Sequence, residues 1–579
     1  MILQELKEYY DRKLQEGTIA KDGWIKGELD FLIDLDLDGN IIGISDLREG
    51  HDKKELDLPN IGKQAVRHSN SGKDANLLWD NSLFVFGLDE KGKIEKGKLR
   101  LKSMIEAIDT WIGETDDLGV KAVRKFLTKG LENRDHFKLA LTHPEYGEIF
   151  KSGRVKISFR VPQSGLPIVF NSPVVIDKLN QIFDFGKKPS KQVRGTCLVT
   201  GIENAVIELT HPPVKGVRGC QSSGGSIVSF NKPSFNSYNK TQSQNAPVSK
   251  SAASQYTKAL ETLLSSSRQC INIGDSTIIF WSKKTSSFES DFAFFFENPQ
   301  EDDSPDAGTH KIKALYDSVY TGAYKDDDGK TPFYILGLAP NSGRIAIRFW
   351  ETGTISEIAS RIKQYFDDFS IIKPPDEMEY YPVWMILENI ATKNEKKNIP
   401  ANLVGDFIRS ILKGTEYPAA MFQLAIRRIR SDPKDRVKPI RAAIIKAYLN
   451  RYNKNKNVRE VSKELDTYNT STSYQLGRLF AVLEKIQEKA NPKINTTIRQ
   501  RFYASASSTP QSVFPNLLRL KNYHLAKLNR ANAVYFEHLL GQIFEQLSEF
   551  PAYLTLHEQG LFAIGYYHQQ QAFFKGKNN

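Results

Sequence analysis

The sequence contains little cysteine and no long apolar run. Its 579 residues include three cysteines, Cys197, Cys220 and Cys270. An odd and sparse set of this kind argues against a disulfide framework and for a reducing cytosol. No stretch approaches the ~18 uncharged apolar residues that a membrane span requires. The first residues, MILQELKEYYDRK, lack the apolar run of a signal peptide. We therefore expect a cytoplasmic protein that does not contact a membrane.

Recognisable catalytic motifs are also missing. The chain has no G-x-x-x-x-G-K-[ST] phosphate loop, no H-E-x-x-H, no G-x-S-x-G and no paired C-x-x-C. Cys197, His211 and Cys220 are spaced by 14 and 9 residues, which matches no zinc pattern and leaves a fourth ligand missing. The acidic clusters at residues 302–303 and 326–328 are typical of solvated loops. We expect a binding protein and not an enzyme, with no cofactor and no metal.

Positive charge is concentrated in two parts of the chain. Residues 401–579 hold 27 Lys and Arg against 13 Asp and Glu, a surplus of 14, whereas the first 400 residues sum to −2 within the net +12. Residues 191–268 form a second excess, because three glutamates there oppose nine basic residues: Lys191, Arg194, Lys215, Arg218, Lys232, Lys240, Lys250, Lys258 and Arg268. Two clusters favour contact with a polyanion such as nucleic acid. The alternative is an ordinary solvated surface.

The residue pattern predicts an α+β fold with several domains. Residues 1–375 mix strand-like and helix-like segments, including a hairpin signature at residues 38–40, the strand-like run LLWDNSLFVFG, a hairpin turning at residues 201–204 and a strand-turn-strand pattern over residues 332–353. Later segments such as YQLGRLFAVLEKIQEK and AVYFEHLLGQIFEQLSEFP have apolar residues at helical spacing. We predict a mixed α/β region over 1–375, a basic helical connector over 376–457 and a helical bundle over 458–579.

One long segment has no carboxylate at all. Residues 219–247 read GCQSSGGSIVSFNKPSFNSYNKTQSQNAP. Ser, Asn, Gln and backbone amides are uncharged donors and acceptors, and glycine allows close approach to a partner. Together with dispersed lysines, such groups suit phosphates and the edges of a DNA groove. The alternative is a disordered surface loop, but Ile227, Val228, Phe230, Phe235 and Tyr238 recur through the segment as expected anchors.

This segment and its surroundings carry a family resemblance. CLVTGIENAVIELTHPPVKGVRGCQSSGGSIVSFNKPSFNSYNKTQSQNAPVSKSAASQYTKALETLL closely resembles the central signature of the large subunit of the type I-C CRISPR surveillance complex, Cascade, in the CRISPR-associated Csd family. Agreement extends to MILQELKEYYDR, ANLLWDNSLFVFG, GDSTIIFWS, YILGLAPNSGRIAIRFW, YQLGRLFAVLEKIQ and LFAIGYYHQQQAFF. The resemblance therefore covers both ends and the middle of the chain.

The resemblance implies a non-catalytic subunit of an RNA-guided DNA-targeting complex. Its expected partners are guide RNA (crRNA), double-stranded target DNA, the displaced non-target strand, the Cascade backbone, 5′-handle-binding and small subunits, and a helicase-nuclease effector. Its expected roles are recognition of the protospacer-adjacent motif (PAM), promotion of unwinding and R-loop formation, and recruitment of the effector. The C-terminal bundle resembles the small subunit. The resemblance also implies that the small subunit can be made separately, by internal translation of the same message. Because the last methionine is Met421, such a separate product would require a non-AUG start near Val458 or Val461.

We expect small, amide and lysine side chains in two loops, residues 70–76 and 221–226, and at four positions near the second loop to recognise the PAM and to form the strand-separating wedge. These residues are Asn70, Ser71, Gly72, Lys73, Asn76, Gln221, Ser222, Ser223, Gly224, Gly225, Asn231, Lys232, Asn236 and Lys240. The basic faces of the C-terminal helices are expected to bind the DNA backbone. The residues expected there are Arg427, Arg428, Arg430, Lys434, Arg441, Lys446, Arg451, Lys454 and Arg459.

Two other classes of protein stay open at the level of sequence. A stand-alone nucleic-acid-binding regulator would share the basic helices, but it would bind duplex DNA without a guide complex. A metal-dependent nuclease would need a metal centre that the motifs do not supply.

Overall fold

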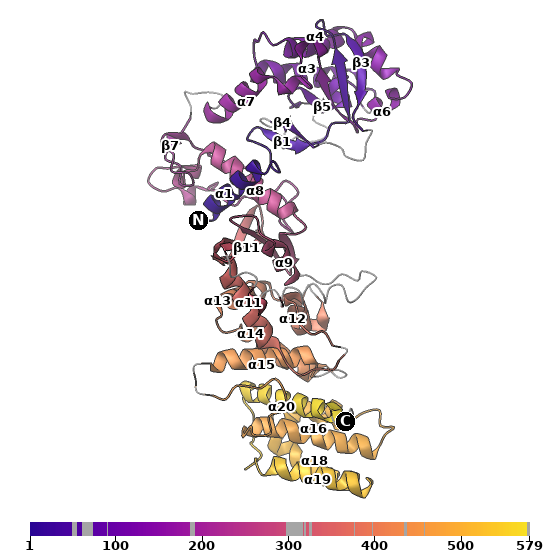
Figure 1. Cartoon of the computed structure of the whole chain (residues 1–579), viewed down its shortest axis with the longest axis vertical. Helices are drawn as coiled ribbons and strands as arrows, with labels where there is room; N and C mark the ends of the chain where they lie inside the picture. Colours follow the sequence, from indigo (N-terminus) through magenta and orange to yellow (C-terminus); the bar gives the residue numbers. More distant parts are fainter. Residues whose placement is uncertain are drawn as a thin grey trace. The chain divides into compact units, whose positions relative to one another are not determined.

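The computed structural model describes most of the chain as two compact units (Figure 1). It describes residues 1–48, 55–60, 73–89, 91–185, 192–296, 317, 320–322, 327–375, 377–395, 398–432, 437–454, 456 and 458–575. Unit 1 comprises residues 1–215 and 221–262, and unit 2 comprises residues 216–220 and 263–579. The predicted α+β class is confirmed, because strands and helices alternate up to residue 354 and every described element after it is a helix. The finer division at residues 375 and 457 stays a prediction.

Unit 1 contains a mixed four-stranded sheet in the order β3-β2-β6-β5. The strands are β2 (Phe31–Leu35), β3 (Ile41–Asp46), β5 (Trp79–Asn81) and β6 (Lys156–Arg160). β2 and β3 form the hairpin predicted at residues 38–40, in which the Asp36 carboxylate accepts hydrogen bonds from the backbone N–H groups of Asp38 and Asn40. Gly39 supplies the positive φ, 77°, that this turn needs. β2 and β6 are parallel, whereas β5 and β6 are antiparallel.

Helices pack against this sheet and close its core (Figure 1). α3 (Ile94–Trp111) and α4 (Leu118–Glu132) contact each other, and α4 also contacts β2. The buried ring of Phe126 on α4 packs on those of Phe137 and Phe159, and such aromatic burial is a main source of core stability. Shorter helices complete this part of the unit: α2 (Ser82–Val85), α5 (Lys138–Leu141), α6 (Gly147–Lys151) and α7 (Pro173–Phe185).

The run LLWDNSLFVFG is only partly the strand that its apolar residues predict. β5 ends at Asn81, and the next four residues form α2. The side chain of Asn81 accepts hydrogen bonds from the N–H groups of Leu83 and Phe84, which caps the helix and ends the strand. Phe84 and Val85 are buried from this helical turn and not from a strand.

The rest of unit 1 combines two long helices, the second of which ends in the first residues of unit 2, with short strand pairs. The helices are α1 (Ile2–Gln15) and α8 (Lys250–Ser265); β1 (Trp24–Gly27) pairs with β4 (Leu56–Pro59), and β7 (Arg194–Gly195) pairs with β8 (Ala205–Val206). β7 and β8 flank the predicted turn at residues 201–204, but only two residues pair on each side and the connection, residues 196–204, is longer than predicted. The Asp22 carboxylate accepts hydrogen bonds from Ser251 and Gln255 at 2.8 and 2.9 Å, which fixes α8 to the segment after α1.

Unit 2 contains an antiparallel sheet in the order β12-β11-β10-β9. Its strands are β9 (Cys270–Ile273), β10 (Ser276–Ser282), β11 (Pro332–Asn341) and β12 (Arg344–Thr354). β11 and β12 form the predicted strand-turn-strand, with Ser342 at a φ of 54° in the turn. Thr354 and Glu357 then form a capping box at the start of α11 (Ile355–Phe369), so the chain passes directly from the sheet into the helical part.

The helices of unit 2 share one apolar core with this sheet. They are α9 (Phe288–Phe294), α12 (Val383–Ile390), α13 (Ala401–Lys413), α14 (Ala419–Ser431), α15 (Pro439–Asn453), α16 (Thr472–Ala490), α17 (Ile498–Ala506), α18 (Pro510–Leu525), α19 (Arg530–Phe544) and α20 (Leu556–Lys575). α16 and α19 confirm the two helices predicted from apolar spacing. α16 and α20 pack with their backbones in contact at Gly477 and Gly565.

Candidate nucleic-acid interface

The part of the carboxylate-free segment that belongs to unit 1, residues 221–247, is fixed to the rest of that unit near both of its ends. Val214 and Gly225 exchange two backbone hydrogen bonds of 2.9 Å, and Leu198 donates to the carbonyl of Pro247 at 2.9 Å. Gly224, which directly precedes Gly225, has a φ of 95°, and a Cβ there would lie 2.8 Å from the Val214 carbonyl oxygen. A glycine is therefore required at this position both by its conformation and by the close approach of another backbone.

Most of the predicted PAM-contacting residues in this segment lie at the surface. Gln221, Ser222 and Ser223 are exposed, in the turn that Gly224 closes by donating to the Gln221 carbonyl at 2.9 Å. The exposed set also includes Asn231, Lys232, Asn236 and Lys240. Gly225 is buried. Its role is to hold the turn, so the polar side chains of residues 221–223 are presented on a backbone of defined geometry.

The other loop predicted to contact the PAM, residues 70–76, is only partly described and is not fully exposed. Asn70, Ser71 and Gly72 lie outside the described residues, and Lys73 is exposed. Asn76 is only 8% exposed, and its backbone N–H donates to the Asp80 carboxylate at 2.8 Å. The prediction that Asn76 faces DNA is therefore wrong, because the residue is buried at the edge of the apolar core.

The apolar and aromatic residues of the segment do not all anchor it. Ile227, Val228, Phe230 and Phe235 are half-buried, as an anchoring role requires. Tyr238, in contrast, is 93% exposed, so the expectation that it anchors the segment is wrong. It lies in the turn between Ser237 and Lys240, where its side chain projects away from the folded unit.

Cys197 and His211, two of the three residues considered as metal ligands, have other partners in unit 1. The Cys197 sulfur accepts a hydrogen bond from the Ser249 N–H at 3.2 Å. His211 Nδ1 lies 2.6 Å from the Tyr256 hydroxyl, and both residues are buried. In the described part of the chain, no group of three or more His, Cys, Asp or Glu residues is arranged to hold a metal ion.

Two buried histidines are expected to make stability depend on pH. Burial lowers the pKa of His211 to about 4 and that of His568 to about 3, from 6.5. The unfolded chain therefore takes up these protons first, so stability is full above pH 6.5 and falls as the pH drops below it. At pH 5 each histidine should cost about 2 kcal/mol of unfolding free energy. Thermal melts of His568→Gln between pH 7.5 and 5 should show a flatter decline, whereas the exposed His538→Gln should keep the slope of the unchanged chain.

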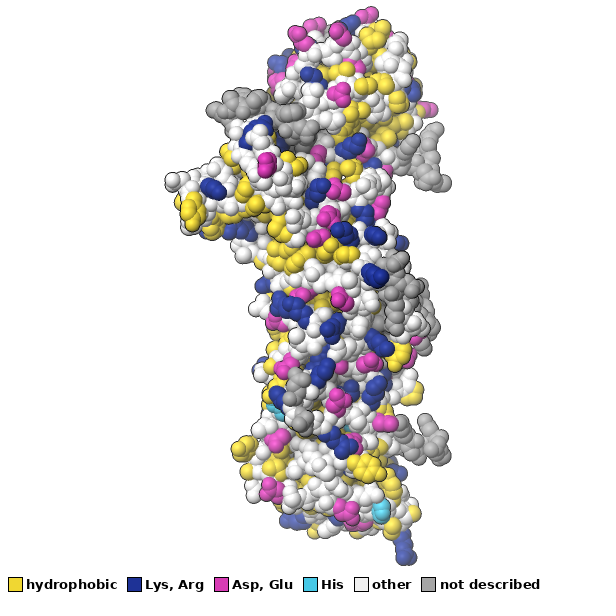
Figure 2. All heavy atoms as spheres, turned by 60° about the vertical axis from the view of Figure 1, so that its left-hand side comes forward, with side chains coloured by type: hydrophobic (Ala, Val, Ile, Leu, Met, Phe, Trp, Pro, Cys, Tyr) yellow, Lys and Arg dark blue, Asp and Glu magenta, His cyan; other side chains and the backbone are white. Residues whose placement is uncertain are grey.

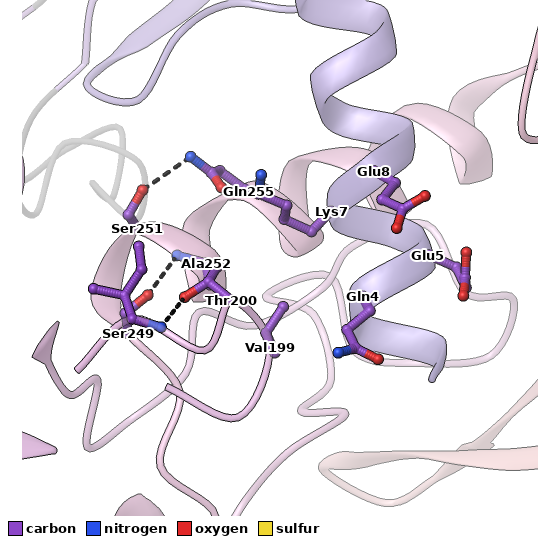
Figure 3. A pocket seen from close by; sticks show the side chains of 11 residues that line it. Gln4, Glu5, Lys7, Glu8, Val199, Thr200, Ser249, Ser251, Ala252 and Gln255 are labelled. Atoms are coloured by element: carbon purple, nitrogen blue, oxygen red, sulfur yellow. Dashed lines mark hydrogen bonds between the residues drawn. The ribbon is translucent and has the colours of Figure 1, made fainter. Parts of the chain in front are cut away.

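A pocket of about 560 Å³ with a mixed polar and apolar lining lies between α1, the turn before β8 and the start of α8 (Figure 3). α1 contributes Gln4, Glu5, Lys7 and Glu8 to its wall. Ser251 and Gln255, which are hydrogen-bonded to each other, line the side formed by α8. Two carboxylates against one lysine make this pocket a poor site for a phosphate backbone.

The helical part of unit 2 presents some of the predicted backbone-binding residues to solvent. Arg427 and Arg430 on α14 are exposed, as are Lys454 after α15 and Arg459. Arg459 is paired with the Asp466 carboxylate at 2.8 Å. Arg428 is largely buried and contacts Asp432 and Asn394, and Lys434 lies outside the described residues. Figure 2 shows Lys and Arg side chains spread over one face of the molecule with Asp and Glu among them, so individual exposed arginines are the candidates.

Three other predicted backbone-binding residues are buried on α15, which corrects the prediction for them. Arg441 is fully buried and pairs with Asp432 at 3.1 Å. Lys446 donates to the Asp368 carbonyl at 2.9 Å, and burial lowers its pKa to about 8. Arg451 pairs with the Asp368 carboxylate at 2.7 Å. α15 is covered on several sides by other helices, so these three charges lie inside the protein beside the partners named above and not on a DNA-facing surface.

The comparisons with known proteins identify the class and the family. A family model described as a CRISPR-associated protein matches residues 6–574, so the chain is a CRISPR-associated protein. Within that class it belongs to the Cas_Csd1 family, which confirms the Csd family resemblance of the sequence. No curated protein matches it. Among the residues that the structure describes, no helix is long and apolar enough to cross a membrane.

Proposed function

We propose that this protein is the non-catalytic large subunit of a type I-C Cascade, which recognises the PAM on duplex DNA. The observation that carries the proposal is the set of exposed polar and lysine side chains in the carboxylate-free residues 221–247 of unit 1, in a chain of the Cas_Csd1 family. Its amide and hydroxyl side chains can exchange hydrogen bonds with base edges, and its lysines can contact phosphates. Gly224 and Gly225 hold Gln221, Ser222 and Ser223 in one turn, which favours a defined register on a groove.

The proposal divides sequence recognition between the protein and an RNA. The protein reads a short motif, and pairing between guide RNA and the target strand reads the rest. In this scheme the subunit promotes unwinding and R-loop formation, contacts the displaced strand, and recruits a helicase-nuclease. Its other proposed partners are the guide RNA and the backbone, 5′-handle-binding and small subunits of the complex, in the cytoplasm.

The test is copurification of the chain with guide RNA and the backbone subunits, followed by binding to target duplexes with the PAM intact or scrambled. We expect a stable complex that binds the intact target at least about tenfold more tightly, since each well-placed base contact contributes about 1–3 kcal/mol of discrimination. Equal binding to both duplexes would refute the role in PAM recognition. Sequence-specific duplex binding by the lone chain would identify a stand-alone regulator, and metal-dependent cleavage by it would identify a nuclease.

The variant Gln221→Ala, Ser222→Ala, Ser223→Ala is expected to lose the preference for the intact PAM. The three side chains are exposed, so their removal should leave folding unchanged, and Gly224 and Gly225 are kept because they fix the turn. Binding to the intact target should fall by about tenfold or more, while binding to the scrambled target should change little. Electrophoretic mobility-shift titrations at one salt concentration measure the ratio. An unchanged ratio would show that recognition lies elsewhere.

The variant Arg427→Ala, Arg430→Ala is expected to weaken binding to all DNA sequences equally. Each lost phosphate contact should reduce the slope of log K against log salt by about 0.9, so the slope should fall by about 2 for the pair. Titrations between 50 and 200 mM salt measure the slope. The matched variant Arg427→Lys, Arg430→Lys keeps the charge and should keep the slope. A selective loss on one sequence would instead indicate base contacts.

A further inference from the structure

The turn formed by Ser237, Tyr238, Asn239 and Lys240 has an unusual conformation. Ser237 and Lys240 form an antiparallel bridge, with a backbone hydrogen bond of 2.8 Å from the Lys240 N–H to the Ser237 carbonyl. Tyr238 and Asn239 have φ values of 49° and 57°. Two consecutive positive φ angles define a type I′ turn, in which Asn and Gly are preferred. A tyrosine at this position is strained, and such strain is kept where the surrounding structure enforces it, often in ligand-binding elements.

The surrounding structure enforces this turn through Asn245. Its side-chain oxygen accepts a hydrogen bond from the Ser237 N–H at 3.1 Å. Its side-chain nitrogen donates to the carbonyls of Lys240 and Gln242 at 3.0 and 2.9 Å. One asparagine thus fixes the chain on both sides of Tyr238. The ring is therefore carried on a rigid support and not on a freely moving loop.

Burial does not explain why a tyrosine occupies this position. Its side chain is 93% exposed, so it contributes almost nothing to the core. Lys232 and Lys240 nearby in the chain are exposed, and no Asp or Glu occurs between Glu208 and Glu261. An aromatic face on a rigid support, in a basic region without carboxylates, is the chemistry that binds an unpaired base of a nucleic acid.

We propose that Tyr238 stacks on an unpaired nucleobase of the target DNA beside the PAM. The inference rests on the proposed function, and it assigns to this one ring the contact that holds a base once its pair has opened. Aromatic stacking accepts any base, because each has a π face. The turn would therefore stabilise the opened state without adding to the preference for particular PAM bases. Lys232 and Lys240 would contact the adjoining phosphates.

The experiment uses the assembled complex and targets that carry one 2-aminopurine at each of the first three positions beside the PAM, on either strand. This base is dark while it is stacked in the duplex or covered by an aromatic ring, and bright when it is unpaired and unstacked. Permanganate oxidation of neighbouring thymines measures the opening of the duplex. With the unchanged complex, at least one position should stay dark although the duplex there has opened. Tyr238→Ala should make that position bright and slow the opening by about 5- to 100-fold, whatever base stands there. Tyr238→Phe should behave like the unchanged complex, since the ring remains.

Two further variants separate the ring from the strain and from general effects of an exposed tyrosine. Tyr238→Gly relieves the positive φ but removes the ring, so it should behave like Tyr238→Ala. Tyr468→Ala removes a tyrosine that is 79% exposed in unit 2, and it should change nothing. If Tyr238→Ala leaves fluorescence and opening rate unchanged at every position, the inference is wrong while PAM recognition can still hold. Loss of copurification with the other subunits would also overturn it, because the ring would then contact protein. A complex that ignores the PAM would refute the proposed function itself.

Discussion

Replacing Gly565 by alanine is expected to lower the free energy of unfolding by about 3 kcal/mol. Gly565 lies on α20 where that helix crosses α16, and a Cβ there would lie 2.1 Å from the Tyr474 carbonyl oxygen. Gly477 on α16 is in the same situation, because a Cβ there would lie 2.0 Å from the Phe562 carbonyl oxygen of α20. Because the obstructing atoms belong to backbone, no side-chain rotation can relieve the clash. The helices must separate and lose packing along their contact.

Urea unfolding followed by far-UV circular dichroism measures this loss, and the chain offers a matched control. Gly541 lies within α19, and a Cβ there would meet nothing within 4 Å. Gly541→Ala should therefore be neutral or stabilise the chain by up to about 1 kcal/mol, since alanine is the better helix former. If Gly565→Ala unfolded at the same urea concentration as Gly541→Ala, the close crossing of α16 and α20 would be wrong.

Much of the fold could be predicted from the sequence, because its signals are local. The turn at Asp36–Asn40 gives β2 and β3, and apolar residues at helical spacing give α16 and α19. The run LLWDNSLFVFG, which contains β5 and then α2, shows where such signals fail. Its apolar residues fit a strand as well as a buried helical turn, and the Asn81 side chain decides between them by capping α2.

The candidate site was predictable only where exposure follows from composition. Gln221, Ser222 and Ser223 are polar residues in a glycine-rich turn, and they are exposed as expected. The expectation that Tyr238 is an anchor fails because aromatic residues are usually buried, whereas this one is exposed in a turn with a positive φ. The adjacent Asn239, a common residue of type I′ turns, was the signal that could have placed it at a tip.

The prediction that the basic residues of α15 bind the DNA backbone is wrong for another reason. A sequence with a surplus of positive charge suggests an exposed basic face, but the partners of Arg441 and Arg451 are set by tertiary structure. Asp368 precedes Arg451 by 83 residues, and no local pattern links the two. Burial of a charge can be foreseen only when its partner can be. The sequence alone therefore favours a DNA contact for arginines that lie on a helix covered by other helices.

Arg451→Met is expected to lower the free energy of unfolding by about 3–5 kcal/mol and to leave the salt dependence of DNA binding unchanged. Arg451 also donates to the carbonyls of Ser410 and Thr415 at 2.8 Å, and its guanidinium lies 3.9 Å from the centre of the Tyr417 ring. Burial raises the pKa of Asp368, and Arg451 opposes that effect. Without the arginine, the buried carboxylate keeps its desolvation cost and loses its cation.

The double variant Arg451→Met, Asp368→Asn separates a structural ion pair from a DNA contact. Removing both charges should recover part of the lost stability, because no unpaired charge then remains inside the protein. Urea unfolding gives the stabilities, and binding titrations on the assembled complex give the salt slopes. Arg427→Ala, Arg430→Ala should show the opposite pattern, with a lower slope and unchanged stability, because those side chains are exposed. If Arg451→Met lowered the slope and kept the stability, this arginine would lie on the DNA-binding surface, and the buried pair with Asp368 would be wrong.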